Sequence, residues 1–124
     1  MAELKQYQLY IDGAWRDGAK SRRFPTINPF TRQAWASIPQ AEAGDVADAV
    51  AAARRAFPDW SARPGIERQK LMLRLAELLE ADADRMSRLE TTDNGKVIRE
   101  AKPQMLSAAR QYRCFAGYAD KIYG

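Results

Sequence analysis

Apolar and polar positions alternate with a period of about two in the first forty residues, a pattern typical of β-strands. Asp12-Gly13 supplies the positive-φ pair of a tight hairpin turn, and residues 31–33 supply a second turn before Pro39 closes the region. Asn28-Pro29 biases the chain toward extended geometry. The predicted extended segments are residues 7–11, 14–16, 24–27 and 34–38. The sequence therefore predicts β-hairpins within residues 1–40.

From Ala43 the apolar period lengthens to 3.6, which predicts an amphipathic helix. Asp45 and Asp48 are expected in its first turn and Arg54-Arg55 in its last turns, where their charges suit the helix dipole. Pro58 is expected to end the helix. The residues of its apolar face are Val46, Ala49, Val50, Ala53 and Phe57.

A second helical region is predicted from Ile66 to Asp93, divided or kinked near residues 81–84 and ended by Asn94-Gly95. Its apolar stripe is wide enough to face a core. The residues of this stripe are Leu71, Leu75, Leu78, Leu79, Ala83, Met86 and Leu89.

A third helix is predicted to begin near Pro103, because proline is tolerated in the first turn of a helix. Its expected apolar face comprises Ala108, Tyr112, Phe115, Ala119 and Ile122. The fold class expected within this chain is therefore α+β, with a β-hairpin region at residues 1–40 and a region of three or four amphipathic helices at residues 43–124.

Composition narrows the function classes. The chain has 124 residues, of which 46% are hydrophobic and 29% charged, so one ordinary globular domain is expected. No apolar run is long enough for a membrane span, and the first five residues lack the pattern of a secretory signal, which favours the cytoplasm. The net charge of +4 is dispersed among acidic residues, which argues against nucleic-acid binding.

Cys114 is the single cysteine, so it cannot form an internal disulfide. A nucleophilic thiol needs a base or a positive environment, but the chain contains no histidine and Arg113 points about 100° away on a helix. Helical packing is the expected role of Cys114.

Several segments, in their order along the chain, resemble the N-terminal part of the NAD(P)-dependent aldehyde dehydrogenases. The resemblance covers nearly the whole chain, and the Asn-Pro dipeptide and residues 89–96 are its most specific marks. Arg32 departs from the family, which usually has glycine at this turn, so the backbone of the turn is expected either to differ from that of the family or to carry strain. The matching segments include YIDGAW at 10–15, TINPFT at 26–31, DVADAVAAARRAF at 45–57, Trp60, Arg68, residues 71–79, LETTDNGK at 89–96 and residues 112–124.

The resemblance implies that residues 1–124 form the N-terminal part of a cofactor-binding, Rossmann-like α/β domain in an enzyme that oxidises an aldehyde to a carboxylic acid with NAD or NADP. In that family a cysteine thiolate attacks the carbonyl, hydride passes to the nicotinamide, and a glutamate base assists thioester hydrolysis. The catalytic cysteine, the glutamate and the nucleotide-binding residues have no counterpart in this sequence. No catalytic or cofactor-binding residue is therefore assigned, and the isolated chain is expected to be inactive.

A monovalent cation, potassium or sodium, is bound by similar aldehyde dehydrogenases, and the family's ligand positions match Thr26, Ile27 and Asp93. Asp93 would also lie at the negative end of a helix dipole, where a carboxylate needs a positive partner. Lys96 or Arg99 is an alternative partner for Asp93, as in an ordinary surface ion pair.

Two classes of function remain open. The chain is either the opening piece of a dehydrogenase, whose partner is the remainder of that enzyme or another copy of itself, or a non-catalytic helical interaction module derived from the family. A CoA-acylating relative also stays open within the enzyme class. The sequence does not specify the aldehyde, the choice between NAD and NADP, the oligomeric state, or whether the chain is a natural truncation, a split subunit or an expressed fragment.

Overall fold

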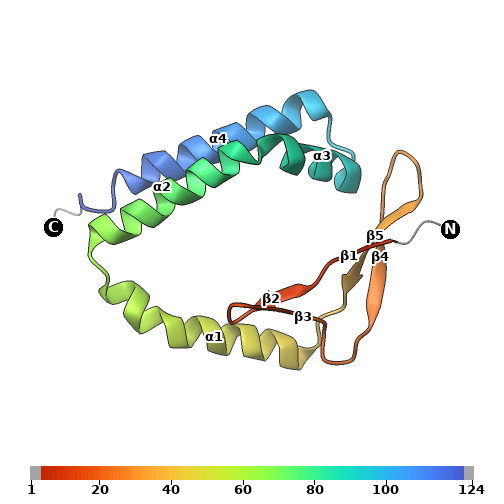
Figure 1. Ribbon diagram of the computed structural model, residues 1–124, viewed down its shortest axis with the longest axis horizontal. Helices are drawn as coiled ribbons and strands as arrows, with labels where there is room; N and C mark the ends of the chain where they lie inside the picture. Colours follow the sequence, from red (N-terminus) through yellow and green to blue (C-terminus); the bar gives the residue numbers. More distant parts are fainter. Residues whose placement is uncertain (1–3, 122–124) are drawn as a thin grey trace. The chain divides into compact units, whose positions relative to one another are not determined.

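A computed structural model describes residues 4–121 and contains five short strands followed by four helices (Figure 1). The chain divides into two compact units, unit 1 at residues 1–61 and unit 2 at residues 62–124. The elements are β1 (Lys5–Gln6), β2 (Leu9–Ile11), β3 (Ala14–Arg16), β4 (Arg23–Ile27), β5 (Ala34–Pro39), α1 (Ala43–Ala62), α2 (Gly65–Ala81), α3 (Ala83–Asn94) and α4 (Ile98–Ala116). The predicted α+β order is confirmed.

Unit 1 contains two small sheets. Strands β2 and β3 form an antiparallel hairpin, and its turn has φ of 55° at Asp12 and 79° at Gly13, as predicted for this dipeptide. The other sheet has the order β1-β5-β4, in which β1 is parallel and β4 antiparallel to β5. The Arg23 guanidinium joins its strands by donating to the carbonyl oxygens of Tyr7, at 2.5 Å, and Ser37, at 2.8 Å.

The predicted strand at residues 7–11 is divided in the structure. Lys5–Gln6 pairs with β5, and the Tyr7 amide still donates to the Ser37 carbonyl at 3.0 Å, whereas Leu9–Ile11 pairs with β3. The chain thus changes pairing partners between Tyr7 and Leu9. Alternation alone identified the extended geometry but did not identify the two pairing partners.

Helix α1 begins with a carboxylate cap that the sequence pattern did not reveal. Asp45 is only 4% exposed, and its carboxylate accepts hydrogen bonds from the amides of Glu42, at 2.9 Å, and Ala19, at 3.1 Å. Glu42 is the residue before the helix, so Asp45 satisfies one of the amides that a helix start leaves unpaired. The same carboxylate fixes the loop at Ala19.

The expected end of α1 at Pro58 is wrong, because the helix continues to Ala62. Pro58 removes one hydrogen bond, the one to the Arg54 carbonyl, and this part of the helix is exposed, so water can satisfy that oxygen. As a result Arg54-Arg55 does not occupy the last turn of α1. The expectation for the first turn is met by Asp45 and not by Asp48.

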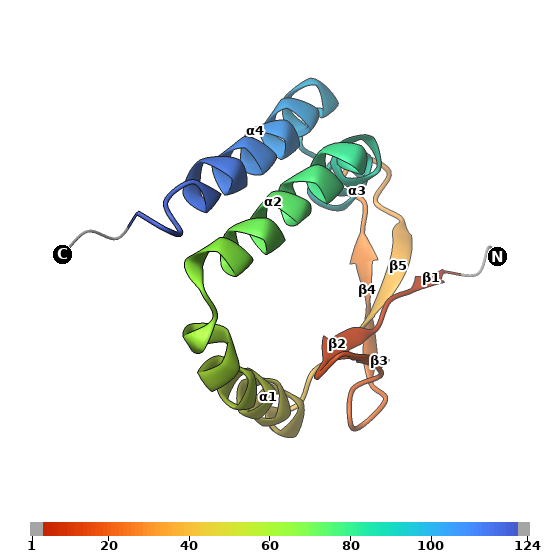
Figure 2. The same cartoon turned by 60° about the vertical axis from the view of Figure 1, so that its left-hand side comes forward.

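In unit 2, α2 and α4 lie side by side and antiparallel, with α3 beside them (Figure 2). Gly65 at the start of α2 approaches the end of α4 so closely that a Cβ there would lie 2.2 Å from the Ala119 carbonyl oxygen. The Gln69 side chain donates to the Ala116 carbonyl at 3.1 Å. Small residues fill the contact, which lets the helices approach closely. The buried residues are Ala76, Ala83, Ser87, Ala101, Ala109 and Ala116.

The predicted division of the second helical region is confirmed at Asp82, and Gly95 ends α3 with φ of 81°. The predicted start of the third helix is wrong. The chain enters α4 at Ile98, where the Ala101 amide donates to the Val97 carbonyl at 3.0 Å, so Pro103 lies inside the helix.

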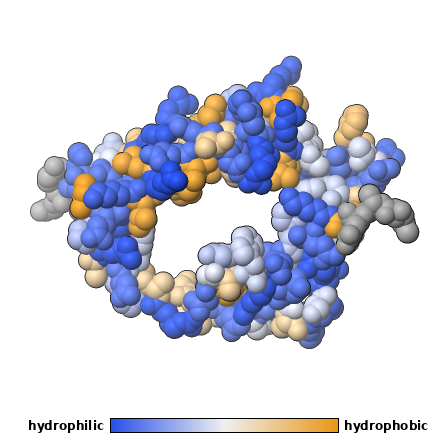
Figure 3. Space-filling model, viewed as in Figure 1, coloured by the Kyte–Doolittle hydropathy of each residue, from blue (hydrophilic) through white to orange (hydrophobic). Residues whose placement is uncertain are grey.

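The expected apolar faces of unit 2 are only partly buried. Leu71 and Leu78 are 46% and 50% exposed, and Figure 3 shows hydrophobic residues at the surface of the helical unit. On α4, Tyr112 and Phe115 are exposed, Ala108 is half-buried and Ala119 follows the helix end, while Ile122 lies outside the described residues. The buried apolar residues of these helices are therefore alanines, and many of the larger apolar side chains lie at the surface.

Among residues 4–121, none of the helices is both long enough and apolar enough to cross a membrane.

A Gly18→Ala substitution is expected to destabilise unit 1 by about 1–3 kcal/mol, since overpacking against fixed atoms strains the fold. The added Cβ would lie 2.7 Å from the Gln40 carbonyl oxygen, which belongs to the backbone. The matched control is Gly44→Ala in α1, where nothing lies within 4 Å, and this change is expected to stabilise by about 0.4–1 kcal/mol. Urea unfolding monitored by circular dichroism measures both, and equal midpoints would contradict the packing at Gly18.

Acid is expected to weaken the cap of α1. The hydrogen bonds from the Glu42 and Ala19 amides lower the pKa of Asp45 below its ordinary value of 3.8. Because the folded-state pKa is the lower one, the stabilisation is present above pH 4 and is lost as the pH falls through the folded-state pKa. Thermal melts from pH 6 to pH 2 are expected to show a steeper acid loss in the parent than in Asp45→Asn. Identical pH profiles would remove Asp45 from this role.

Candidate functional site

Thr26 and Ile27, two of the three predicted cation ligands, lie at an irregular point of β4. Thr26 pairs with Ala36 and Ile27 with Ala34, so the register shifts between them and Trp35 is the extra residue on β5. A shift of this kind disrupts the regular ladder of backbone hydrogen bonds. Thr26 is half-buried and Ile27 is 46% exposed.

The turn after β4 carries the positive φ expected at Arg32. Its φ is 58°, a left-handed value that favours glycine, and the Arg32 amide donates to the Asn28 carbonyl at 2.8 Å. The Asn28 side-chain oxygen accepts from the Phe30 amide at 2.9 Å. Side-chain and backbone bonds of Asn28 thus hold a turn that the family usually builds with glycine.

Asp93, the third predicted ligand, is an exposed residue in the last turn of α3. Lys96, one of the two proposed alternative partners of Asp93, donates to Glu90 at 2.7 Å. Asp93 belongs to unit 2, whereas Thr26 and Ile27 belong to unit 1, so each unit holds part of the predicted set. Among residues 4–121 there is no cluster of three or more His, Cys, Asp or Glu side chains able to hold a metal ion.

Cys114 is exposed on α4, which corrects the expectation that it packs within the helices. Its neighbour Arg113 bonds to Glu80 of α2 at 2.7 Å, and this hydrogen bond lowers the pKa of Glu80. The guanidinium is therefore engaged between the two helices.

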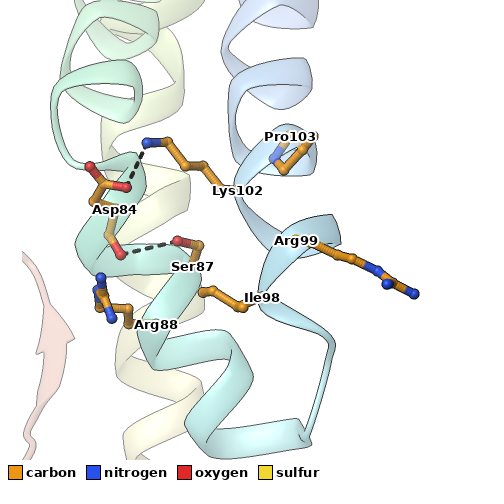
Figure 4. Close-up of a pocket in the computed structure, with 7 residues that line it drawn as sticks. All are labelled: Asp84, Ser87, Arg88, Ile98, Arg99, Lys102 and Pro103. Atoms are coloured by element: carbon orange, nitrogen blue, oxygen red, sulfur yellow. Dashed lines mark hydrogen bonds and ion pairs between the residues drawn. The ribbon is translucent and has the colours of Figure 1, made fainter.

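A groove of about 390 Å³ lies between α3 and the first turns of α4 (Figure 4). Within it Lys102 forms an ion pair with Asp84 at 2.7 Å, which lowers the pKa of the Asp84 carboxyl. The buried Ser87 hydroxyl donates to the Asp84 carbonyl at 3.0 Å, and Arg99 points away from the groove. The ion pair between Lys102 and Asp84 joins α4 to α3. Sequence periodicity did not single out this set, because ion pairs between helices leave no local pattern.

A sequence model of the aldehyde dehydrogenase family matches residues 15–124. The chain belongs to this family. The match covers unit 1 from Trp15 onward, all of unit 2, the two turns at the ends of β4 and α3, and all four helices, so the predicted resemblance is confirmed.

Three similar proteins describe the relationship further. The chain is 47% identical over 123 residues to a (Z)-2-((N-methylformamido)methylene)-5-hydroxybutyrolactone dehydrogenase of Acinetobacter baylyi, covering 98% of this chain and 25% of that protein. It is 39% identical to the betaine aldehyde dehydrogenase of Bacillus subtilis, covering 94% and 24%. The crystal structure of PnpE in complex with nicotinamide adenine dinucleotide superposes with a TM-score of 0.90 at 40% identity, covering 96% and 25%.

The chain thus spans about a quarter of the length of these relatives. Its strands and helices reproduce the fold of that quarter.

Proposed function

We propose that this chain is the N-terminal quarter of an aldehyde dehydrogenase that uses NAD or NADP to oxidise an aldehyde to a carboxylic acid. The observation that carries the proposal is the family match along residues 15–124. The similar structure of PnpE, solved in complex with nicotinamide adenine dinucleotide, supports a nicotinamide dinucleotide as the cofactor. The chain's own role in the complete enzyme is to support the domain that holds the cofactor, and residues 1–124 form the first part of that domain.

The isolated chain is proposed to be inactive, because the chemistry that the family requires is missing from its sequence. A thiolate needs activation by a base or by positive charge, and the exposed Cys114 has a neighbour, Arg113, that is engaged with Glu80. The partner of the chain is accordingly the remainder of the dehydrogenase, with self-association as the second outcome, and the complete enzyme is proposed to reside in the cytoplasm.

A monovalent cation is proposed to bind at Thr26, Ile27 and Asp93 in the complete enzyme. Support comes from the resemblance, whose ligand positions match these three residues, and from the preference of hard cations for oxygen ligands. The position of Asp93 in the last turn of α3, where carbonyl oxygens also gather, is consistent with a cation as its neighbour.

A chimaera tests the proposed function. Residues 1–124 replace the corresponding quarter of the Bacillus subtilis betaine aldehyde dehydrogenase, and NADH formation with betaine aldehyde is measured. The chimaera is expected to retain a kcat within about tenfold of that of the parent enzyme, because a well-packed supporting segment costs little at the reacting centre. The purified 124-residue chain and the Bacillus enzyme without its first quarter are the controls, and both are expected to give no NADH above the blank.

An inactive, unfolded chimaera would contradict the proposed function. Activity of the isolated chain would contradict its proposed dependence on a partner.

Potassium is expected to raise the Tm of the folded chimaera relative to choline chloride at equal ionic strength, because a ligand that binds only the folded state stabilises it. Asp93→Asn is expected to abolish the increase. The matched control is Asp59→Asn, which changes an exposed carboxylate of α1. Equal Tm values in the two salts would remove the proposed site.

A further inference from the structure

Helix α3 ends in an exposed Asn-Gly dipeptide. Asn94 is the last residue of the helix, Gly95 follows it with φ of 81°, and both residues are exposed to solvent. The Gly95 amide donates to the Thr91 carbonyl at 3.0 Å, and the Lys96 amide donates to the Asn94 side-chain oxygen at 2.9 Å. The side-chain amide of Asn94 is therefore folded back onto the backbone that follows it, and water can reach it.

This arrangement places an electrophilic carbon close to a backbone nitrogen that can attack it. In deamidation the Gly95 nitrogen forms a bond to the Asn94 side-chain carbon, the bond from that carbon to its amino group breaks, and ammonia leaves with the proton that Gly95 loses. Water then opens the resulting five-membered succinimide ring at either of its two carbonyl groups. The products are aspartate and isoaspartate at position 94.

Two features of the turn favour this attack. Glycine has no Cβ, so no side chain shields the Gly95 nitrogen. The Lys96 N–H points at the oxygen on which negative charge collects as Gly95 attacks, and a donor in that position stabilises the tetrahedral intermediate. The hydrogen bond that shapes the turn therefore also polarises the Asn94 carbonyl group.

The other asparagine of the chain cannot react by this route. The sequence contains two asparagines, and Asn28 precedes Pro29, whose ring nitrogen carries no proton. The Asn28 side-chain oxygen likewise accepts from a backbone amide in a turn, that of Phe30 at 2.9 Å. The two sites thus share a hydrogen-bonded side-chain oxygen and differ in the nitrogen that follows. Deamidation through a ring is expected at Asn94 and not at Asn28.

The last turn of α3 opposes the reaction while it is closed. The Gly95 N–H is held by the Thr91 carbonyl, and ring closure requires Asn94 to leave the helical conformation. The ends of helices fray, and such local openings cost much less free energy than global unfolding. The folded chain is therefore expected to react from the frayed turn, and more slowly than the unfolded chain.

We propose that Asn94 is a site of spontaneous deamidation, with water as its co-reactant and the last turn of α3 as the element that sets its rate. The reaction belongs to the 124-residue chain itself and does not depend on the proposed function. The product places a carboxylate beside Asp93, at the end of α3 where the helix dipole disfavours negative charge. Asn94 is thus a point at which ageing changes the charge of α3.

Ageing of the purified chain at pH 8 and 37 °C, followed by peptide mass spectrometry, tests the proposal. The peptide that contains Asn94 is expected to gain the mass difference between an amide and an acid, as two products that chromatography separates. The peptide that contains Asn28 is the internal control and is expected to keep its mass. Conversion is expected to be slower at pH 6, where the Gly95 nitrogen loses its proton less often, and faster in urea, where α3 is unfolded.

Asn94→Gln is the matched variant, because glutamine keeps an amide at the helix end but would have to close a larger, less favourable ring. Loss of the mass increase is expected. A folded chain that keeps Asn94 intact while the chain in urea is converted would overturn the proposal, since the turn would then be closed to the reaction. Equal rates in buffer and in urea would contradict the role of α3. A single aspartate product, or equal conversion at Asn28, would show hydrolysis without the ring and would also contradict the proposal.

Discussion

The contact between the charged side of α1 and the β2–β3 hairpin determines which side of the helix unit 1 leaves exposed. Asp48 bonds to Arg16 and Arg55 pairs with Asp12, so the helix presents its charged side to the hairpin and its valines and aromatic rings elsewhere. The Asp45 cap adds a fixed starting point at Glu42. A segment that folded for itself would bury its apolar side, so this arrangement supports the proposal that the chain is part of a larger enzyme.

Unit 2 also leaves large apolar side chains exposed, for a different structural reason. Its helices meet through alanines such as Ala76 and Ala109, and this close contact leaves larger side chains, including Leu78 and Phe115, at the surface. The Arg113 bond to Glu80 and the Lys102 pair with Asp84 connect the helices at the edges of that contact. Both units are therefore held together by small residues and charges, while much of their apolar area stays available to a partner.

The sequence predicted the elements whose signals are local. The Asp12-Gly13 turn, the break at Asp82 and the Gly95 helix end follow from backbone preferences, and the family resemblance followed from the order of such pieces. The partner change within residues 5–11 and the alanine contacts depend on distant segments, so periodicity did not reveal them. Pro58 and Pro103 lie inside helices because helical packing and solvent outweigh the loss of one hydrogen bond. The cation ligands were assigned by resemblance, with a helix-dipole argument for Asp93 only, and they remain a prediction.

Amide hydrogen exchange in α1 tests most directly whether this chain is shaped for a larger enzyme. The central residues of α1 are expected to exchange rapidly in the isolated chain, because few tertiary contacts protect them, and to be strongly protected in the folded chimaera with the Bacillus enzyme. Strong protection of α1 already in the isolated, monomeric chain would show that the helix is complete without a partner, and would contradict the account.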